Sequence, residues 1–186
     1  MSSADHSGMN GIAQTGELSV GGFVSMKRIY SILVENRAGV LCKTAGLFWR
    51  RCFNIDSITV GETDDREVSS MVIVSSGDER TLEQIEKQLN KKLDVIKVKT
   101  FDESESINRE LLLVKIKYNR GNRRDIMDNC QIMGARIVDM SRNQMMIEMC
   151  DTPERVAIFL DTLKSVSIVE ITRTGVLAMT KCNEPG

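Results

Sequence analysis

Few residues in this sequence have the type and spacing that catalysis needs. The only histidine, His6, lies in an N-terminal segment rich in Ser and Gly, so general acid–base chemistry by imidazole is excluded for the folded part. The cysteines form no C-x-x-C pair and have no histidine nearby, which argues against a zinc site or a redox dithiol. We expect all of them to be small buried apolar side chains in a reducing compartment. They are Cys42, Cys52, Cys130, Cys150 and Cys182.

The residues best suited to bind a small molecule lie in the segment VENRAGVLCKTAGLF, residues 34–48. This segment is typical of a strand that turns at Asn36 into an amphipathic helix. A helix N-terminus presents unpaired N–H groups and a positive dipole end, which suit a carboxylate or a phosphate. Gly39 would let a ligand approach the backbone, and Asn36 could bond to the ligand or to the helix. Plain helix capping by Asn36, with Gly39 relieving crowding, is the simpler interpretation and stays open.

Apolar residues beside this turn suggest what else a ligand would carry. Val40, Leu41 and Ile55 could form a pocket next to the anion site, although such residues more often belong to a core. The combination favours a small ligand that has both a carboxylate and a hydrocarbon side chain. The acidic loop TDDRE is best interpreted as solvated, and no second acidic cluster supports a metal site.

The order of strand and helix patterns positions this turn in a β-α-β-β-α-β unit, and the same order then recurs. The first unit has strand patterns at 28–36, 53–62, 68–76 and 94–101 and helical patterns at 40–51 and 79–93. The second has strand patterns at 110–118, 135–141, 143–150 and after 167, and helical patterns at 122–134 and 152–163. We therefore expect an α+β protein with two ferredoxin-like βαββαβ domains. The expected division is a disordered tail at 1–27, a domain at 28–101, a linker at 102–108 and a domain at 109–186.

One strand of the first unit is apolar on both faces. In SSMVIVSS, Met71 and Ile73 point one way while Val72 and Val74 point the other. Two helices can cover only one face of a four-stranded sheet. The second face must therefore meet the second domain, a second copy of the chain or another protein.

Composition excludes several partners. The 25 basic and 26 acidic residues leave a formal charge of −1, so we expect neither nucleic acid nor an anionic membrane as a partner. The central strands lack the exposed aromatic residues with which βαββαβ domains stack RNA bases. Residues 1–27 fit neither a secretory signal nor a transit peptide, and no apolar run approaches the length of a membrane helix. We expect a soluble, cytoplasmic protein.

Several blocks of sequence resemble the small, regulatory subunit of acetolactate synthase, also called acetohydroxyacid synthase. The resemblance runs from about residue 28 to 180 and is most specific in AGLF-x-RR-x-FNI-x-S-x-TVG, residues 45–61. Further blocks are GDERTLEQIEKQLNKKLDVIKV, RELLLVKIK and EITRTGVLAM. The resemblance implies that the N-terminal domain is an ACT domain and that the chain is a non-catalytic regulator of branched-chain amino acid biosynthesis. It would activate a large catalytic subunit and confer feedback inhibition by valine.

The resemblance also implies a binding site built from two copies of the chain. In a homodimer whose ACT sheets meet, valine or a related branched-chain amino acid would bind at the seam. One copy would contribute Asn36, Ala38, Gly39, Val40 and Leu41, and the other Asn54 and Ile55. Gly61 is similar to a position implicated in the feedback response. The resemblance places thiamine diphosphate, magnesium and FAD on the catalytic partner, and this chain would hold no cofactor, metal or catalytic residue.

Two other functions fit part of the pattern. A free-standing ACT amino-acid sensor for another partner would keep Asn36 and Gly39, but it would need no second domain. The block EITRTG, which resembles the synthase small subunit, argues against this alternative. An acylphosphatase-like hydrolase could use Arg37 and an asparagine, but the glycine-rich phosphate cradle is missing.

Overall fold

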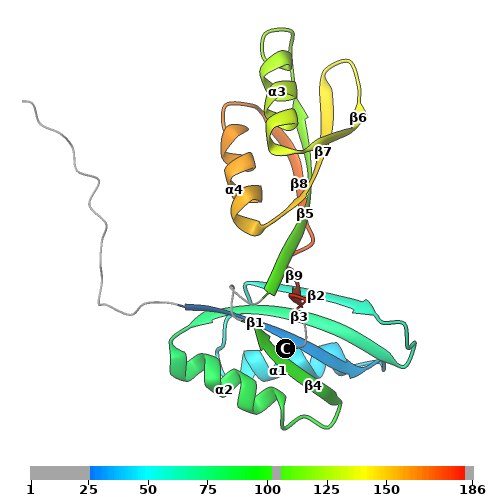
Figure 1. Cartoon of the computed structure of the whole chain (residues 1–186), viewed down its shortest axis with the longest axis vertical. Helices are drawn as coiled ribbons and strands as arrows, with labels where there is room; N and C mark the ends of the chain where they lie inside the picture. The colour runs from blue at the N-terminus through cyan, green and yellow to red at the C-terminus, as the bar shows by residue number, and fades with distance from the viewer. Residues whose placement is uncertain (1–25, 102–105, 183–186) are drawn as a thin grey trace, which may run out of the picture.

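The computed structural model describes residues 26–101 and 106–182, which form two α+β domains (Figure 1). The expected tail at 1–27 lies outside this range except for its last two residues, which open β1. The first domain consists of β1 (Met26–Glu35), α1 (Val40–Arg50), β2 (Ser57–Glu62), β3 (Val68–Gly77), α2 (Glu79–Leu89) and β4 (Val95–Phe101). Its antiparallel sheet has the order β2-β3-β1-β4.

The second domain repeats this order and adds a strand. It consists of β5 (Ser106–Lys117), α3 (Arg123–Met133), β6 (Arg136–Met140), β7 (Gln144–Asp151), α4 (Pro153–Thr162), β8 (Ile168–Arg173) and β9 (Leu177–Thr180). The sheet order is β6-β7-β5-β8, and β9 pairs with the first residues of β5. The predicted fold class, two ferredoxin-like units, is confirmed. β5 begins at Ser106, so residues 106–108 of the expected linker lie in a strand.

Local sequence signals explain where the helices begin and end. The Asp78 carboxylate accepts a hydrogen bond of 2.7 Å from the Thr81 N–H and caps α2. Thr152 caps α4, and Pro153 occupies the first turn, where no intrahelical N–H is needed. Gly134 ends α3 with a left-handed φ of 72°.

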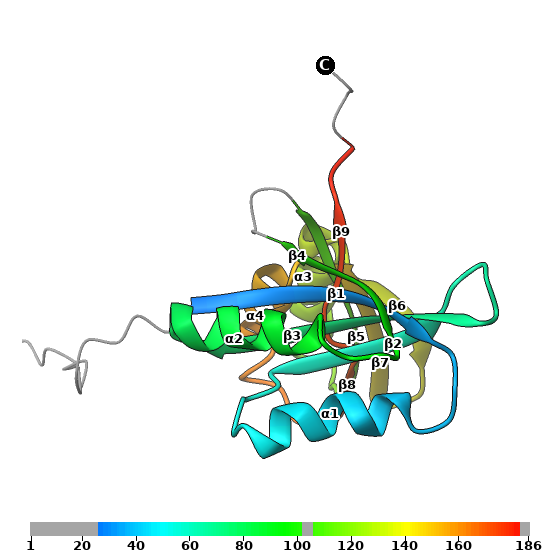
Figure 2. The same ribbon diagram turned by 90° about the horizontal axis from the view of Figure 1, so that it is seen from below.

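Each domain has its own core between the sheet and its two helices. In the first domain, Tyr30 and Phe48 are fully buried, and the Tyr30 hydroxyl donates a hydrogen bond of 2.8 Å to the carbonyl of Leu82. Figure 2 shows α1 running along the β2 side of this sheet and α2 lying on the side of β1. Since β2 is an edge strand, α1 and β2 together form one flank of the domain.

The second face of the first sheet is only partly apolar. At one end lies a small buried cluster, and Val176 and Ala178 of the second domain pack against it. This cluster consists of Ile29, Val72, Val74 and Phe101. The two-sided pattern predicted for β3 is therefore confirmed, and its outer apolar part is covered by the second domain. Towards the other end, the same face carries Ser31, Ser70, Lys97 and Lys99.

A short segment next to β9 joins the two domains. The Thr59 hydroxyl of β2 donates to the carbonyl of Thr174 at 2.9 Å, and the Val176 N–H donates to the Ser57 hydroxyl at 3.4 Å. Between them, Gly175 has a φ of 81°, and a Cβ at this position would lie 3.1 Å from the Ser57 Cβ. A side chain at this position would crowd Ser57 and would need a left-handed backbone, which glycine adopts without strain.

Candidate functional site

The turn between β1 and α1 leaves the start of the helix uncapped. The N-cap residue is Gly39, which has a φ of 88°, and no side chain among the described residues caps α1. The expectation that Asn36 begins the helix as its cap is therefore wrong. The Val40 N–H donates to the Arg37 carbonyl at 3.3 Å, and no described side chain caps the N–H groups that follow it, so a ligand could bind there.

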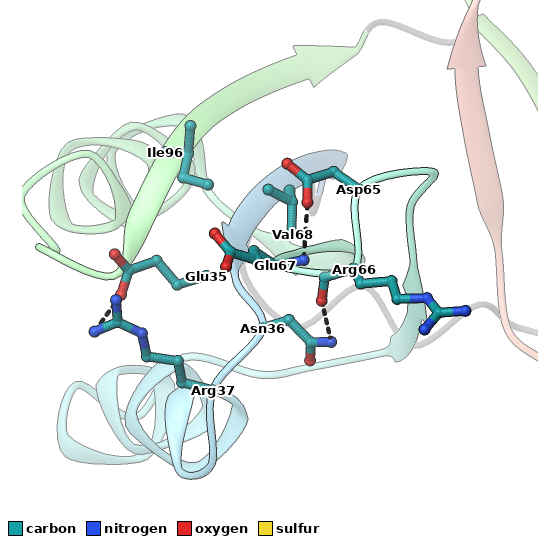
Figure 3. A pocket seen from close by; sticks show the side chains of 8 residues that line it. All are labelled: Glu35, Asn36, Arg37, Asp65, Arg66, Glu67, Val68 and Ile96. Atoms are coloured by element: carbon teal, nitrogen blue, oxygen red, sulfur yellow. Dashed lines mark hydrogen bonds and ion pairs between the residues drawn. The ribbon is translucent and has the colours of Figure 1, made fainter.

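Asn36 instead anchors the turn to the β2–β3 hairpin. Its side-chain nitrogen donates to the Arg66 carbonyl at 2.9 Å (Figure 3) and to the Glu62 carboxylate at 3.3 Å. Its backbone N–H donates to the Glu67 carbonyl at 2.7 Å. Because both side-chain N–H groups point at the hairpin, only the Asn36 amide oxygen remains to accept a hydrogen bond from a ligand.

A cavity of about 410 Å³ lies on the hairpin side of this turn. Its walls are mostly charged, and only Val68 and Ile96 are apolar (Figure 3). The remaining wall residues are Glu35, Asn36, Arg37, Asp65, Arg66 and Glu67. Acidic groups on its rim disfavour a carboxylate, and a hydrocarbon side chain would find little apolar surface there. Asn36 is also the only one of the predicted effector-binding residues in this wall.

The other predicted residues of the turn differ in burial. Ala38 and Gly39 are exposed, whereas Val40 is 4% exposed and belongs to the core between sheet and helices. Leu41 is 46% exposed, so its side chain points away from that core. The exposed Ala38 and Gly39 before α1 and the exposed Leu41 in its first turn therefore occur side by side.

The remaining predicted residues lie elsewhere in the same domain. Asn54 and Ile55 follow the C-terminus of α1, and the 11 residues of this helix span about 16 Å. Within one chain they therefore do not join the N-terminal end of α1. Gly61 lies on β2 next to Glu62, close to the anchored Asn36, and a Cβ there would meet no atom within 4 Å.

Further large apolar side chains are exposed on this flank. Trp49 of α1 is 80% exposed and Val60 of the edge strand β2 is 43% exposed. Trp49 therefore does not pack against the second domain. Together with Leu41, these residues give the α1–β2 flank an apolar character that a solitary domain does not need.

Titratable groups of the first domain do not form a catalytic constellation. Burial raises the pKa of Tyr30 well above its usual value, but its hydroxyl is used in the hydrogen bond to Leu82. Among residues 26–101 and 106–182, no three His, Cys, Asp or Glu side chains converge where they could hold a metal ion. The described helices include none that is long and apolar enough to cross a bilayer.

The cysteines differ from the expectation that all are buried. Only Cys130 is buried, and desolvation raises the pKa of its thiol. The expectation is wrong for the other four, which lie on outer surfaces and at element ends where the fold offers no core position. They are Cys42, Cys52, Cys150 and Cys182.

The two domains match two family models in the order in which they occur along the chain. Residues 30–97 match the AHAS small subunit-like ACT domain, and residues 109–182 match the small subunit of acetolactate synthase. The chain belongs to the acetolactate synthase small-subunit family. The predicted family and the predicted ACT domain are therefore confirmed, and both ferredoxin-like units of the fold are part of the match.

Relatives of this family are similar along nearly their whole length. A probable acetolactate synthase small subunit of Archaeoglobus fulgidus is 43% identical over 159 residues, which cover 86% of this chain and 99% of the relative. The acetolactate synthase isozyme 3 small subunit of Salmonella typhimurium is 39% identical over 84% of this chain and 96% of its own. These names agree with the interpretation of the chain as a non-catalytic subunit.

A solved structure of a family member has the same fold. The crystal structure of the acetolactate synthase small subunit from Thermotoga maritima superposes with a TM-score of 0.80 and is 38% identical. It covers 85% of this chain and 99% of the other. The arrangement of the two domains seen here is therefore shared with a family member studied by crystallography.

Glu62 and Arg66 were not predicted as part of the site. They hold Asn36 through contacts that span 26 and 30 residues of sequence. No local pattern marks them, because their place beside Asn36 is set by the register of the β2–β3 hairpin.

Proposed function

We propose that this chain is the regulatory subunit of acetolactate synthase, which activates the catalytic subunit and makes it sensitive to valine. The observation that carries the proposal is the uncapped start of α1 at Gly39, with the exposed Leu41 beside it. Thiamine diphosphate, magnesium and FAD would be bound by the catalytic partner. This chain would act in the cytoplasm as a binding protein for the effector.

The start of α1 offers complementary groups for an amino acid backbone. The ligand's carboxylate would accept hydrogen bonds from the first N–H groups of the helix, where the positive dipole end also favours it. The amide oxygen of Asn36 would accept a hydrogen bond from the ligand's ammonium group. Because hydrogen bonds to Glu62 and Arg66 hold Asn36, this oxygen is positioned before the ligand arrives.

The apolar part of the site would be completed by a second copy of the chain. Asn54 and Ile55 lie at the opposite end of α1, so they would reach the ligand from the partner in a two-fold homodimer. The edge strand β2 has no neighbouring strand on its outer side among the described residues. Pairing two such edges would bury Val60, Leu41 and Trp49 and join the two sheets.

Regulation requires that the interface between the two ACT sheets has more than one arrangement. A ligand that contacts both copies stabilises the arrangement in which its contacts are best. The coupling free energy between effector and catalytic partner would be about 1–3 kcal/mol. Gly61 and Glu62 lie on β2 at this seam, so a change in edge pairing would also move the anchor of Asn36.

Reconstitution with the cognate catalytic subunit tests the function. Addition of this chain should raise the rate of acetolactate formation, and valine should then lower it. Calorimetry of the chain alone with valine, leucine and isoleucine would identify the preferred effector. A rate that neither rises nor becomes sensitive to valine would contradict the proposal.

Gly39→Asp tests the site. The new carboxylate would repel the carboxylate of the ligand, so valine inhibition should be lost while activation is kept. Gly134→Asp is a matched control, because Gly134 also has a left-handed φ and open space around it but lies in the second domain. Retained inhibition in Gly39→Asp would place the effector elsewhere.

A free-standing sensor for another partner is less well supported. The second domain would have no role in such a protein, yet residues 109–182 match the synthase small subunit.

A further inference from the structure

Arginines gather at the end of the second domain that points away from the ACT domain. Two loops meet there, because the Tyr118 N–H donates to the Asn143 carbonyl at 3.0 Å and the Tyr118 hydroxyl donates to the Ser141 carbonyl at 2.7 Å. Figure 1 shows the start of α3 and the β6–β7 hairpin at this pole. We call the exposed cluster the arginine tip; it consists of Arg120, Arg123, Arg124 and Arg142.

Little negative charge balances the arginine tip. Arg124 approaches Asp128 only to 4.0 Å, and both side chains are largely exposed. The other arginines of the tip form no ion pair with any residue that the structure describes. Several basic side chains elsewhere in the same domain have close partners, such as Glu110 at 2.6 Å from Arg173 and Glu170 at 2.7 Å from Lys115. The tip is therefore an unneutralised positive patch.

The positions of these arginines oppose helix stability. Arg123 and Arg124 occupy the first turn of α3, where the positive end of the dipole disfavours cations. Asp125 is the only acidic residue in that turn, and no described side chain caps the helix. By contrast, α2 and α4 each begin with a side-chain cap. An arrangement that costs stability points to a binding role.

The loop that carries Arg120 is preorganised. The Asn119 side chain accepts hydrogen bonds from the N–H groups of Gly121 and Asn122 at 2.8 and 3.1 Å. In return, the Asn122 side chain accepts from the Asn119 N–H at 2.8 Å. A partner that binds here would therefore not have to order the backbone first.

The chemistry of the tip fits a protein partner better than a nucleic acid. Tyr118 is half-buried and its hydroxyl is engaged, so the tip offers no aromatic face on which bases could stack. The whole chain has a formal charge of −1, which disfavours a polyanion. Arginine side chains bind carboxylates through two parallel hydrogen bonds and are enriched in protein interfaces.

We propose that the arginine tip docks on an acidic patch of the catalytic subunit, a contact separate from the effector site. This inference rests on the proposed function, because it takes the catalytic subunit as the partner. The tip lies at the opposite pole of the molecule from the ACT domain (Figure 1). The second domain would thus hold the enzyme while the ACT domain senses the effector.

Charge reversal in the full-length chain tests the inference. In Arg120→Glu/Arg123→Glu/Arg142→Glu, affinity for the cognate catalytic subunit should fall at least about tenfold at low salt, mainly through slower association. The salt dependence of binding should also weaken. The matched control is Arg80→Glu/Lys91→Glu/Lys97→Glu, which makes the same change in net charge on exposed residues of the ACT domain. This control should change affinity by less than about threefold.

Further measurements separate the outcomes. Valine binding by calorimetry should be the same in both triple variants, and their unfolding curves should show that both fold. Equal loss of affinity in tip variant and control, or none in the tip variant, would overturn the inference while leaving the proposed function intact. If the wild-type chain neither binds nor activates the catalytic subunit, both this inference and the proposed function are wrong. Tight binding of a short RNA duplex that only the tip variant loses would overturn the choice of a protein partner.

Discussion

The Thr59 hydroxyl donates a hydrogen bond of 2.9 Å to the backbone carbonyl of Thr174 and thereby ties the edge strand of the ACT domain to the second domain. The same six-residue strand, β2, carries Glu62, which accepts a hydrogen bond from Asn36. One strand thus contacts both the turn before α1 and the segment before β9. Hydrogen bonds to groups in both domains therefore fix the position of β2.

Gly175→Ala should destabilise the protein. Its φ of 81° costs an alanine about 1–2 kcal/mol. In addition, the new methyl group would lie 3.1 Å from the Ser57 Cβ and 3.2 Å from the Thr59 hydroxyl. The control is Gly61→Ala, on the strand β2 that also carries Ser57 and Thr59. A Cβ at Gly61 meets nothing within 4 Å, so the effect on stability should stay within about 0.5 kcal/mol. Urea unfolding measures both, and equal stability of the two variants would contradict this description of the domain contact.

Arg173→Met should destabilise the second domain. Arg173 donates two hydrogen bonds to Glu110, of 2.8 and 2.6 Å, and the Glu110 side chain is only 4% exposed. Removing Arg173 leaves a buried carboxylate without its partner, which we expect to cost about 1–3 kcal/mol because Arg173 itself is partly solvated. The double variant Glu110→Leu/Arg173→Met should lose less stability than Arg173→Met alone.

A surface pair provides the comparison for that experiment. Lys87 and Glu83 lie one turn apart on α2, at 3.1 Å, and both are more than half exposed. Lys87→Met should therefore change stability by less than about 0.5 kcal/mol. Chemical denaturation of the three variants would decide the matter, and a double variant less stable than Arg173→Met would refute the role of the buried carboxylate.

The Asp78 cap should make stability depend on pH in the acidic range. The hydroxyl and the N–H of Thr81 lower the pKa of Asp78 below its ordinary value of 3.8. A carboxyl group whose folded pKa is lowered stabilises the fold above its unfolded pKa. That contribution is lost as pH falls through the lower, folded value. Asp78→Asn keeps a capping oxygen but no charge, so it should be less stable than wild type at neutral pH.

The difference between wild type and Asp78→Asn should shrink as pH falls well below 3.8. Urea unfolding, monitored by circular dichroism at neutral pH and at a pH well below 3.8, measures this difference in stability. Asp78→Ala, which removes the capping oxygen as well, should stay less stable than Asp78→Asn throughout. A difference that is independent of pH would show that the charge of Asp78 has no part in stabilising α2.

Periodicity and turn chemistry predicted the elements of this fold because they are local properties. The spacing of Leu82, Ile85 and Leu89 placed one face of α2 in the core, where all three are fully buried. The alternation in β3 likewise predicted that Val72 and Val74 face away from Met71 and Ile73, and the two buried clusters separate them in that way.

The partners of these elements were harder to predict because they depend on register. Helix capping by Asn36 was the simpler interpretation of the turn, yet its side chain bonds to a hairpin loop 30 residues away. β9 is four residues long, and nothing in LAMT indicates that Ala178 within it and Val176 before it cover the apolar end of the first sheet. The apolar character of cysteine likewise failed to predict burial, because most positions it occupies here face outward.

Mixing two defective variants should restore part of the effector binding if the site spans two copies of the chain. Gly39→Asp damages the end of α1 that would bind the carboxylate, and Asn54→Ala damages the residues after the opposite end. In a mixed dimer, one seam site combines both changes, whereas the other combines an unchanged Gly39 with an unchanged Asn54. Neither variant alone has an intact site, so each should be insensitive to valine.

Random re-association of equal amounts gives about one half mixed dimers, each with one intact site. Calorimetry should then detect valine binding with about one quarter of the wild-type stoichiometry and an affinity near that of wild type. Two Gly39→Asp preparations mixed in the same way serve as the control and should stay inactive. Within one chain the helix α1, about 16 Å long, lies between Gly39 and Asn54. A site confined to a single copy could not be repaired by mixing. Absence of any recovery, with dimer exchange verified by differently tagged chains, would mean that Asn54 does not belong to the site at Gly39.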